Sequence, residues 1–229
     1  EILKNFSLVI ASILISIYML ELAYALYNVS GYKFNKWSKN KLNRYDIYME
    51  YKNSEKDAVV VVSAENYISD FSSQYNLIPL AGISNKFTIS CNELGFWTYY
   101  QSDRFGFKNA DEIWNKLYFD FVLIGDSFVH GSCVHEKDTI AGQLRKVSKV
   151  LNLGYTGNGP LTEYATLREY FVDNIKSKYV LWFFYENDLA NIEIELSNKI
   201  FAKYIKDISF TQNLINKQDQ IDYISTNLM

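Results

Sequence analysis

A short apolar run that ends in glycine, aspartate and serine most constrains what this 229-residue chain can fold into. Residues 121–124 read FVLI, which is too short for a typical helix and rich in aromatic and branched side chains, as in a buried strand of a parallel sheet. Gly125 ends the run, and Asp126 is a favoured residue just before a helix. The pattern predicts a strand followed by a helix, with Ser127 at the strand's carboxyl end, where open α/β sheets bind ligands.

Two later segments repeat this arrangement of an apolar run followed by polar residues. Residues 150–151 lead into residues 152–159 (NLGYTGNG), and residues 179–184 lead into residues 185–188 (YEND). In a doubly wound sheet of order 2-1-3, the first strand lies between the other two, so the three polar segments meet at one crevice. The sequence therefore predicts an α/β fold, a doubly wound parallel sheet with helices on both faces, over residues 119–229.

The three segments together resemble the SGNH (GDSL) hydrolase family, over about the second half of the chain. In that family the serine of Gly-Asp-Ser is the nucleophile, and Ser127 matches it. A glycine N–H after the second strand and the asparagine amide of a Gly-x-Asn-Asp block stabilise the oxyanion, and Gly157 and Asn187 match these donors. Tyr185 stands where that block has its glycine. The resemblance implies a flavodoxin-like sheet and acyl transfer, with Asp126 ordering the turn and with no cofactor.

The family's catalytic base, a histidine in a late Asp-x-x-His segment, has no counterpart here. The two histidines of the chain are His130 and His135. His130 is three residues after Ser127, so we expect it on the same helix face, partly exposed to solvent and unable to act as the base. We therefore expect the α/β domain to be incomplete at its C-terminal end, with the base supplied beyond Met229, or else to be catalytically silent.

Two functions follow from this resemblance. The first is a serine esterase or O-acyltransferase that acts on a small acyl ester, such as an acetyl group on a surface glycan. The second is a catalytically silent SGNH-like module that binds or assembles parts of surface-polysaccharide machinery. The net charge of −3 and the absence of basic runs argue against nucleic acid as a partner. The spacing of His130, Cys133, His135 and Asp138 matches no zinc pattern, so we expect no metal. The oligomeric state is not predicted.

Residues 6–27 are almost entirely apolar, with Glu21 as the one charge. About 20 such residues cross a bilayer core as a helix, so a single-pass membrane anchor is our first interpretation. A signal peptide is the second, because residues 23–25 (AYA) resemble a cleavage site, and a buried globular helix is the third. The lysines after the run favour a cytoplasmic main domain. Proteins that the chain resembles often act on surface glycans, which favours an extracytoplasmic main domain, and this is the side that we expect.

The region between the anchor and the α/β domain is predicted to be a connector and a small β-rich part. Its residues 58–63 contain four valines in a row, which predicts a strand, and residues 86–101 predict a hairpin. Residues 102–109 (SDRFGFKN) resemble a segment that precedes the Gly-Asp-Ser strand in membrane-linked SGNH proteins. We expect a turn with buried aromatic rings, or alternatively Arg104 at the crevice rim against an anionic substrate.

The expected organisation is thus an anchor (1–28), a connector with the β-rich region (29–118) and the α/β domain (119–229). Cys91 and Cys133 are expected to pair in an oxidising compartment and to stay as two buried thiols otherwise.

Helical spacing predicts helices over several ranges, and no strand signal follows residue 187. The predicted helices cover residues 42–49, 111–118, 139–149, 161–175, 191–206 and 210–224.

Overall fold

The computed structural model describes residues 2–38, 43–54, 57–69, 75–171 and 175–229. The chain divides into two compact units, Glu1–Asn43 and Arg44–Met229. The second unit carries every strand of the described residues. The boundary that the motifs suggest at residues 118 and 119 lies inside this unit. Its main hydrophobic core contains side chains from both sides of that boundary, among them Leu80 and Leu151.

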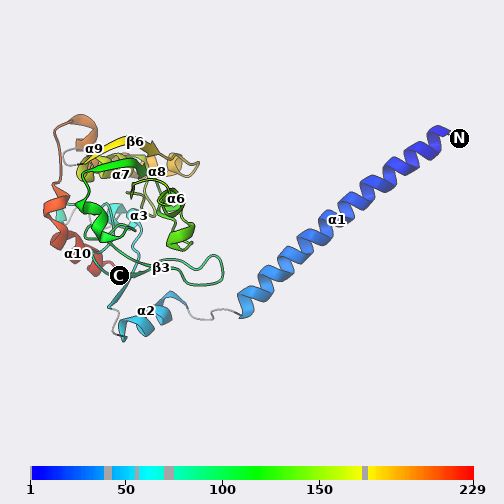
Figure 1. Cartoon of the computed structure of the whole chain (residues 1–229), viewed down its shortest axis with the longest axis horizontal. Helices are drawn as coiled ribbons and strands as arrows, with labels where there is room; N and C mark the ends of the chain where they lie inside the picture. Colours follow the sequence, from blue (N-terminus) through cyan, green and yellow to red (C-terminus); the bar gives the residue numbers. More distant parts are fainter. Residues whose placement is uncertain (1, 39–42, 55–56, 70–74, 172–174) are drawn as a thin grey trace. The chain divides into compact units, whose positions relative to one another are not determined.

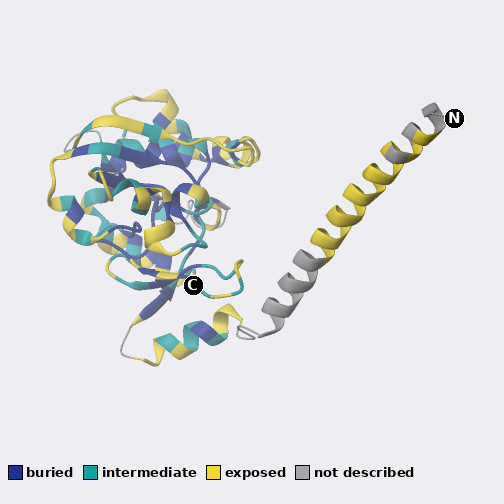
Figure 2. Ribbon diagram, turned by 45° about the vertical axis from the view of Figure 1, so that its right-hand side comes forward, coloured by how far each residue is buried: buried dark blue, intermediate teal, exposed yellow. Residues whose placement is uncertain are grey.

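In the first unit, residues 2–38 form one long helix. Helix α1 (Ile2–Ser38) covers the apolar run of residues 6–27 without a break, as expected for that run. Its described side chains are exposed on every face, for example Leu20 at 71%, and Figure 2 shows this part of α1 in yellow. Within the described ranges, no helix combines the length and the apolar character that crossing a membrane requires.

The larger of the two sheets is parallel and carries the three predicted strand ends. Strands β4 (Tyr118–Ile124), β5 (Val150–Asn152) and β6 (Lys176–Trp182) lie in the order β5-β4-β6. In its register Val122 pairs with Leu151 on one side and with Val180 on the other. The prediction that the first strand lies between the other two is confirmed, so the carboxyl ends of all three strands meet at one edge.

Helices contribute to two separate hydrophobic clusters of this sheet. Leu123 packs in one cluster with Val129 of α5 (Ser127–His130) and Ala141 of α6 (Ile140–Leu144). Val122 and Ile124 point the other way, into the main cluster with Ala165 of α7 (Pro160–Tyr170). Alternate side chains of β4 therefore point to opposite faces of the sheet, as the two-residue period of a strand requires. Helix α7 in turn packs against α8 (Asp188–Ser197) and α9 (Lys199–Lys206) (Figure 1).

The smaller sheet joins β1 (Ala58–Val60), β2 (Phe87–Ile89) and β3 (Tyr99–Gln101). Strands β2 and β3 are antiparallel, with Phe87 opposite Gln101, so the predicted hairpin is confirmed. Strand β1 lies parallel to β2 and ends earlier than the valine run suggests, because α3 (Ala64–Ser69) begins soon after it.

Several predicted helices are shorter than their sequence periodicity suggests. The helix expected over residues 191–206 is split in two, because the Asn198 side chain accepts a hydrogen bond from Ile200 N (2.8 Å) and so caps α9. The helix expected over residues 111–118 is instead a 3₁₀ helix that ends at Asn115, and β4 begins at Tyr118. No strand follows residue 187 in the described chain, as expected. The remaining helical elements are α2 (Arg44–Lys52), η1 (Asp111–Asn115), η2 (Glu136–Asp138), η3 (Leu214–Asn216) and α10 (Gln218–Asn227).

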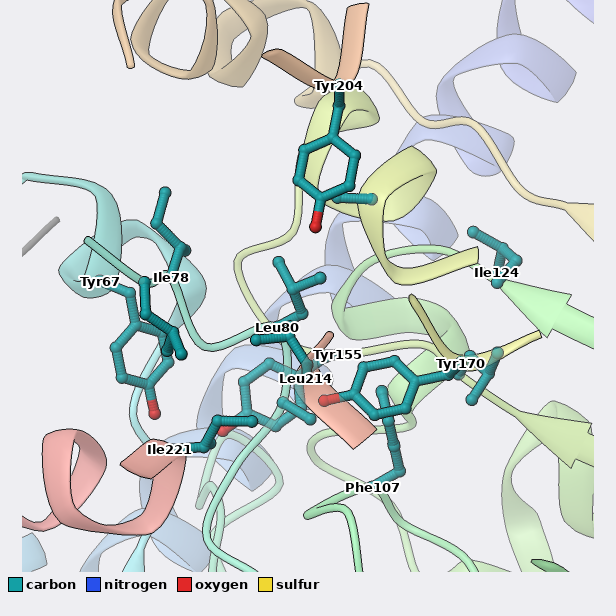
Figure 3. Packing of buried hydrophobic residues seen from close by; sticks show 14 of the residues in the cluster. Tyr67, Ile78, Leu80, Phe107, Ile124, Tyr155, Tyr170, Tyr204, Leu214 and Ile221 are labelled. Carbon is teal, nitrogen blue, oxygen red and sulfur yellow. The ribbon is translucent and has the colours of Figure 1, made fainter. Parts of the chain in front are cut away.

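The C-terminal segment of the chain packs against the core beside residues 67–69 and 75–84. Figure 3 shows Leu214 and Ile221 among Leu80 and Tyr155. Hydrogen bonds join the same two parts of the chain. Ile78 N donates to Gln212 Oε1 (2.8 Å), Ser84 N donates to Asp222 Oδ1 (2.9 Å), and the Tyr67 hydroxyl donates to Ser225 Oγ (2.9 Å). Three separate hydrogen bonds thus hold this N-terminal stretch to the C-terminal segment.

Candidate functional site

Ser127 is the first residue of α5, directly after the carboxyl end of β4. Asp126 caps the helix, because its carboxylate accepts a hydrogen bond from Phe128 N (2.9 Å). The helix is only one turn long and ends at Gly131, whose φ of 66° is the left-handed conformation that glycine favours. The Ser127 side chain is half-buried and lines a cavity of about 660 Å³. Its N–H lies at the helix start, where backbone donors have no partner within the helix.

Gly157 lies in the loop after β5, beside the same cavity. Its φ is +75°, and a Cβ at this position would lie 1.9 Å from Ser63 Oγ, so only glycine fits. The loop is held by two backbone bonds, Tyr155 N to Gly125 O (3.1 Å) and Ala64 N to Thr156 O (3.0 Å). Thr156 lines the cavity together with Ser127. Thr156 and Ser127 therefore border the same cavity, and Gly157 directly follows Thr156 in this loop.

Asn187 lies at the same edge of the sheet as Ser127. Its Nδ2 donates a hydrogen bond to Asp126 Oδ2 (3.1 Å), which links the end of β6 to the residue just before Ser127. The turn that presents Asn187 is closed by Asp188, whose Oδ2 accepts from Tyr185 N (2.7 Å). An Asn187 at the opposite edge would have ruled out a shared oxyanion site, and this arrangement does not occur.

A buried carboxyl group beside this edge was not predicted from the sequence. Glu163, in the first turn of α7, is fully buried, and its Oε2 accepts from Trp182 Nε1 (2.6 Å). Burial raises the pKa of Glu163 to about 8, and the charges of Asp188 and Asp126 add to this effect. The pKa of Asp188 is also raised, first by its burial and then by Asp126. The site therefore gathers several acidic groups, of which Glu163 is protonated at neutral pH.

A second buried acid, Glu195 of α8, caps α7 from outside that helix. Its carboxylate accepts hydrogen bonds from Gly159 N (3.1 Å), Leu161 N (2.9 Å) and Thr162 N (3.0 Å). These donors belong to the first turn of α7, which has no internal acceptors for them. Glu195 thus fixes the start of α7, and with it the loop that contains Gly157.

His130 is fully buried, so the expectation of a partly exposed helix residue was wrong. Its ring is covered by Tyr100 and Tyr155, with ring centroids 5.2 and 5.3 Å away, and its Nδ1 is hydrogen-bonded to Ser132 Oγ (2.9 Å). Burial and the nearby Lys108 charge lower the pKa of His130 to about 3. This imidazole is therefore a poor base. His135 is exposed and stacks on Phe96.

The turn that follows α5 is fastened by several other segments. Cys91 and Cys133 form a disulfide with Cα atoms 5.0 Å apart, so of the two expected states, disulfide or free thiols, the structure has the disulfide. The Ser132 carbonyl accepts from the Ser90 hydroxyl (2.7 Å). Lys108 Nζ donates to Gly131 O (2.7 Å) and to Val134 O (2.9 Å), and burial lowers its pKa to about 8. The cavity wall beside Ser127 is thus anchored covalently and by hydrogen bonds.

The segment of residues 102–109 forms the predicted turn with buried rings. Asp103 organises it, since its carboxylate accepts from Phe107 N (2.9 Å), Asn109 Nδ2 (2.8 Å) and Trp114 Nε1 (2.8 Å), and burial raises its pKa to about 6. Arg104 does not take the alternative role at the crevice. Its guanidinium is paired with the Asp111 carboxylate (2.7 Å).

The described residues include one group with the spacing of metal ligands, Cys91, Glu93 and Cys133. Both sulfurs are taken up by the disulfide, so this group is not a metal centre in this form. Comparisons of the chain with protein-family models, with curated proteins and with solved structures find no match.

Proposed function

We propose that this chain carries the site of a serine esterase or O-acyltransferase of SGNH type, within a doubly wound α/β domain. Ser127 is the nucleophile, and the Gly157 N–H and the Asn187 amide are oxyanion donors. The observation that carries the proposal is the hydrogen bond from Asn187 Nδ2 to Asp126 Oδ2 (3.1 Å), since it joins two of the three strand-end motifs beside the serine. The substrate class is a small acyl ester, such as an acetylated glycan.

In this reaction Ser127 Oγ attacks the acyl carbonyl carbon, and the hydroxyl proton passes to a base. The negative charge moves to the carbonyl oxygen, where the N–H groups of Ser127 and Gly157 and the Asn187 amide stabilise it. Collapse of this intermediate expels the alcohol, which takes up a proton, and leaves an acyl-serine. Water or a sugar hydroxyl then attacks the acyl-serine and restores Ser127. Loss of one such donor lowers turnover by about 10²–10³-fold in other acyl-transfer enzymes.

The base is the part of this chemistry that the described residues do not supply. A serine is activated by a base within hydrogen-bond reach, roughly 2.6–3.2 Å. His130 is buried and bound to Ser132, and His135 stacks on Phe96. We therefore expect slow turnover of an activated ester by residues 1–229.

We further propose that residues 6–27 anchor the chain in a membrane, with the Arg44–Met229 unit on the extracytoplasmic side. The apolar run and the exposure of the described α1 side chains support the anchor, although no helix of the described ranges has the length and apolar character of a membrane span. The disulfide supports an oxidising compartment. Carbonate extraction of membranes that contain the expressed chain tests this. The chain should stay in the membrane fraction, and release without proteolytic processing would contradict the anchor.

A fluorophosphonate probe tests the nucleophile directly, because it reacts covalently with a serine hydroxyl and does not require turnover. Because the described residues supply no base, the full chain should be labelled slowly, and Ser127→Ala should abolish that labelling. Asn187→Ala should slow labelling by at least tenfold, since one donor is lost. Ser197→Ala, at an exposed serine of α8, is the matched control and should label normally. Labelling that persists in Ser127→Ala would overturn the assignment.

The second candidate function is a catalytically silent module that binds acylated glycans or assembles surface-polysaccharide machinery. The burial of His130 favours it, because the histidine nearest to Ser127 in the sequence is unable to act as a base. The two functions differ in the labelling experiment. A silent module would bind an acylated oligosaccharide and leave Ser127 unlabelled, whereas the enzyme site would do both.

A further inference from the structure

Two exposed aromatic rings lie in contact next to the proposed nucleophile. Phe128 is 59% exposed and Tyr185 is 53% exposed, and their ring centroids are 4.7 Å apart. Phe128 directly follows Ser127, and Tyr185 is two residues before Asn187. The Gly-Asp-Ser motif and the YEND motif therefore each contribute one ring to the same spot.

These rings have no role in the hydrophobic core. Neither belongs to any of the three hydrophobic clusters of the described residues, nor packs against one. Exposed aromatic surface is unfavourable in water, and a small apolar patch beside a concave site is a mark of ligand binding. The contact between Phe128 and Tyr185 therefore makes an apolar platform that faces outward.

The cavity next to this platform has a mixed lining. Phe128 borders it together with Ser127 and the Trp97 ring. Arg44, Asn92, Glu93 and Thr156 add guanidinium, amide, carboxylate and hydroxyl groups. Among its described lining residues, the aliphatic side chains are Val61 and Val134. A long acyl chain would need a mainly aliphatic lining, whereas a sugar ring needs aromatic faces for its C–H groups and polar groups for its hydroxyls.

We propose that Phe128 and Tyr185 form a platform on which the sugar ring of an acylated carbohydrate stacks, with the polar cavity groups bonding its hydroxyls. The inference rests on the proposed function for one point, the position of the reacting ester at Ser127. It adds the two residues that select a carbohydrate substrate. Arg104, the residue that the sequence suggested for substrate contact, is instead paired with Asp111.

The test measures the binding of short, partially O-acetylated xylan, chitin and glucan oligosaccharides to the full chain, by saturation-transfer NMR and by titration. At least one oligosaccharide should bind. Phe128→Ala and Tyr185→Ala should each weaken binding by about tenfold, the scale of a lost aromatic contact. Phe128→Leu, which keeps an apolar side chain, should also weaken it, whereas Tyr185→Phe should not.

Tyr118→Ala is the matched control. Tyr118 is also an exposed aromatic residue, at 47%, but it begins β4 and so lies at the opposite edge of the sheet. Its replacement should leave binding unchanged. Circular dichroism of every variant checks the fold, which substitution of exposed rings should preserve.

Fluorophosphonate labelling of Ser127 separates this inference from the proposed function. If Ser127 is labelled but the ring variants bind the oligosaccharides as the parent chain does, the platform is wrong and the nucleophile stands. If binding depends on the rings but Ser127 is not labelled, the platform stands and the enzyme site is wrong. Failure of the parent chain to bind any of the oligosaccharides would also overturn the platform.

Discussion

Replacing Glu163 with glutamine should remove one contribution to the pH dependence of stability, a fall between pH 5 and pH 7. Burial raises the pKa of Glu163 from about 4.5 to about 8, so at pH 7 the carboxyl group is protonated in the folded chain and ionised in the unfolded chain. The unfolded state then holds fewer protons than the folded state, and the free energy of unfolding falls as pH rises through this window. From pH 5 to pH 7 this one group lowers the free energy of unfolding by roughly 2–3 kcal/mol.

Glutamine is a good mimic of the protonated acid, because its Oε1 can still accept the hydrogen bond from Trp182 Nε1. The assay is urea unfolding of the full chain in a nonionic detergent at pH 5, 6 and 7, followed by tryptophan fluorescence. Glu163→Gln should lose the part that Glu163 contributes, a fall of about 2–3 kcal/mol, while the changes due to Asp103 and His130 stay the same in both chains. Glu193→Gln, at an exposed glutamate of α8, should keep this fall. Equal pH slopes for the parent chain and Glu163→Gln would show that Glu163 is ionised in the fold, which would refute the reasoning.

Three other substitutions test the scaffold of the site by the same unfolding assay. Cys91→Ser opens a loop with a sequence separation of 42, which should lower stability by about 4 kcal/mol under oxidising conditions, and an unchanged midpoint would contradict the disulfide. Glu195→Ala should cost about 3 kcal/mol or more, because three buried N–H groups lose their acceptor, whereas Glu193→Ala should change stability by under about 0.5 kcal/mol. Gly157→Ala should cost about 2 kcal/mol from its positive φ and the clash with Ser63, and a neutral effect would contradict the loop geometry.

The strand ends could be predicted because a short apolar run followed by polar residues is a signal that the local sequence carries by itself. The order β5-β4-β6 and the cap at Asp126 follow from those signals, and so does the hairpin of β2 and β3. Helix lengths were less predictable, because a side-chain cap can interrupt a periodic pattern. At Asn198 the cap of α9 outweighs an apolar spacing that continues through it.

Burial by distant segments could not be predicted in the same way. The spacing from Ser127 to His130 indicates which helix face a residue occupies, but not what covers that face. The cover comes from Tyr100 and Tyr155, which lie 30 residues before and 25 residues after His130 in the sequence. Acidic residues in helices usually face water, so Glu163 and Glu195 carried no signal that they would be buried. Glu195 is buried where α8 packs against the start of α7, and Glu163 is buried beside Trp182 of β6.

The packing of the C-terminal segment against residues 67–69 and 75–84 has a consequence for folding during synthesis. The hydrogen bonds of Ile78, Ser84 and Tyr67 to that segment span 134, 138 and 158 residues. At about 5–20 residues per second, a ribosome needs roughly 7–30 s to make the partners after the first segment has emerged. During that interval Ile78 and Leu80, which are fully buried in the finished fold, have no C-terminal partners. The nascent chain is therefore a substrate for chaperones that hold apolar segments, and slow translation of the last part of the message should increase its aggregation.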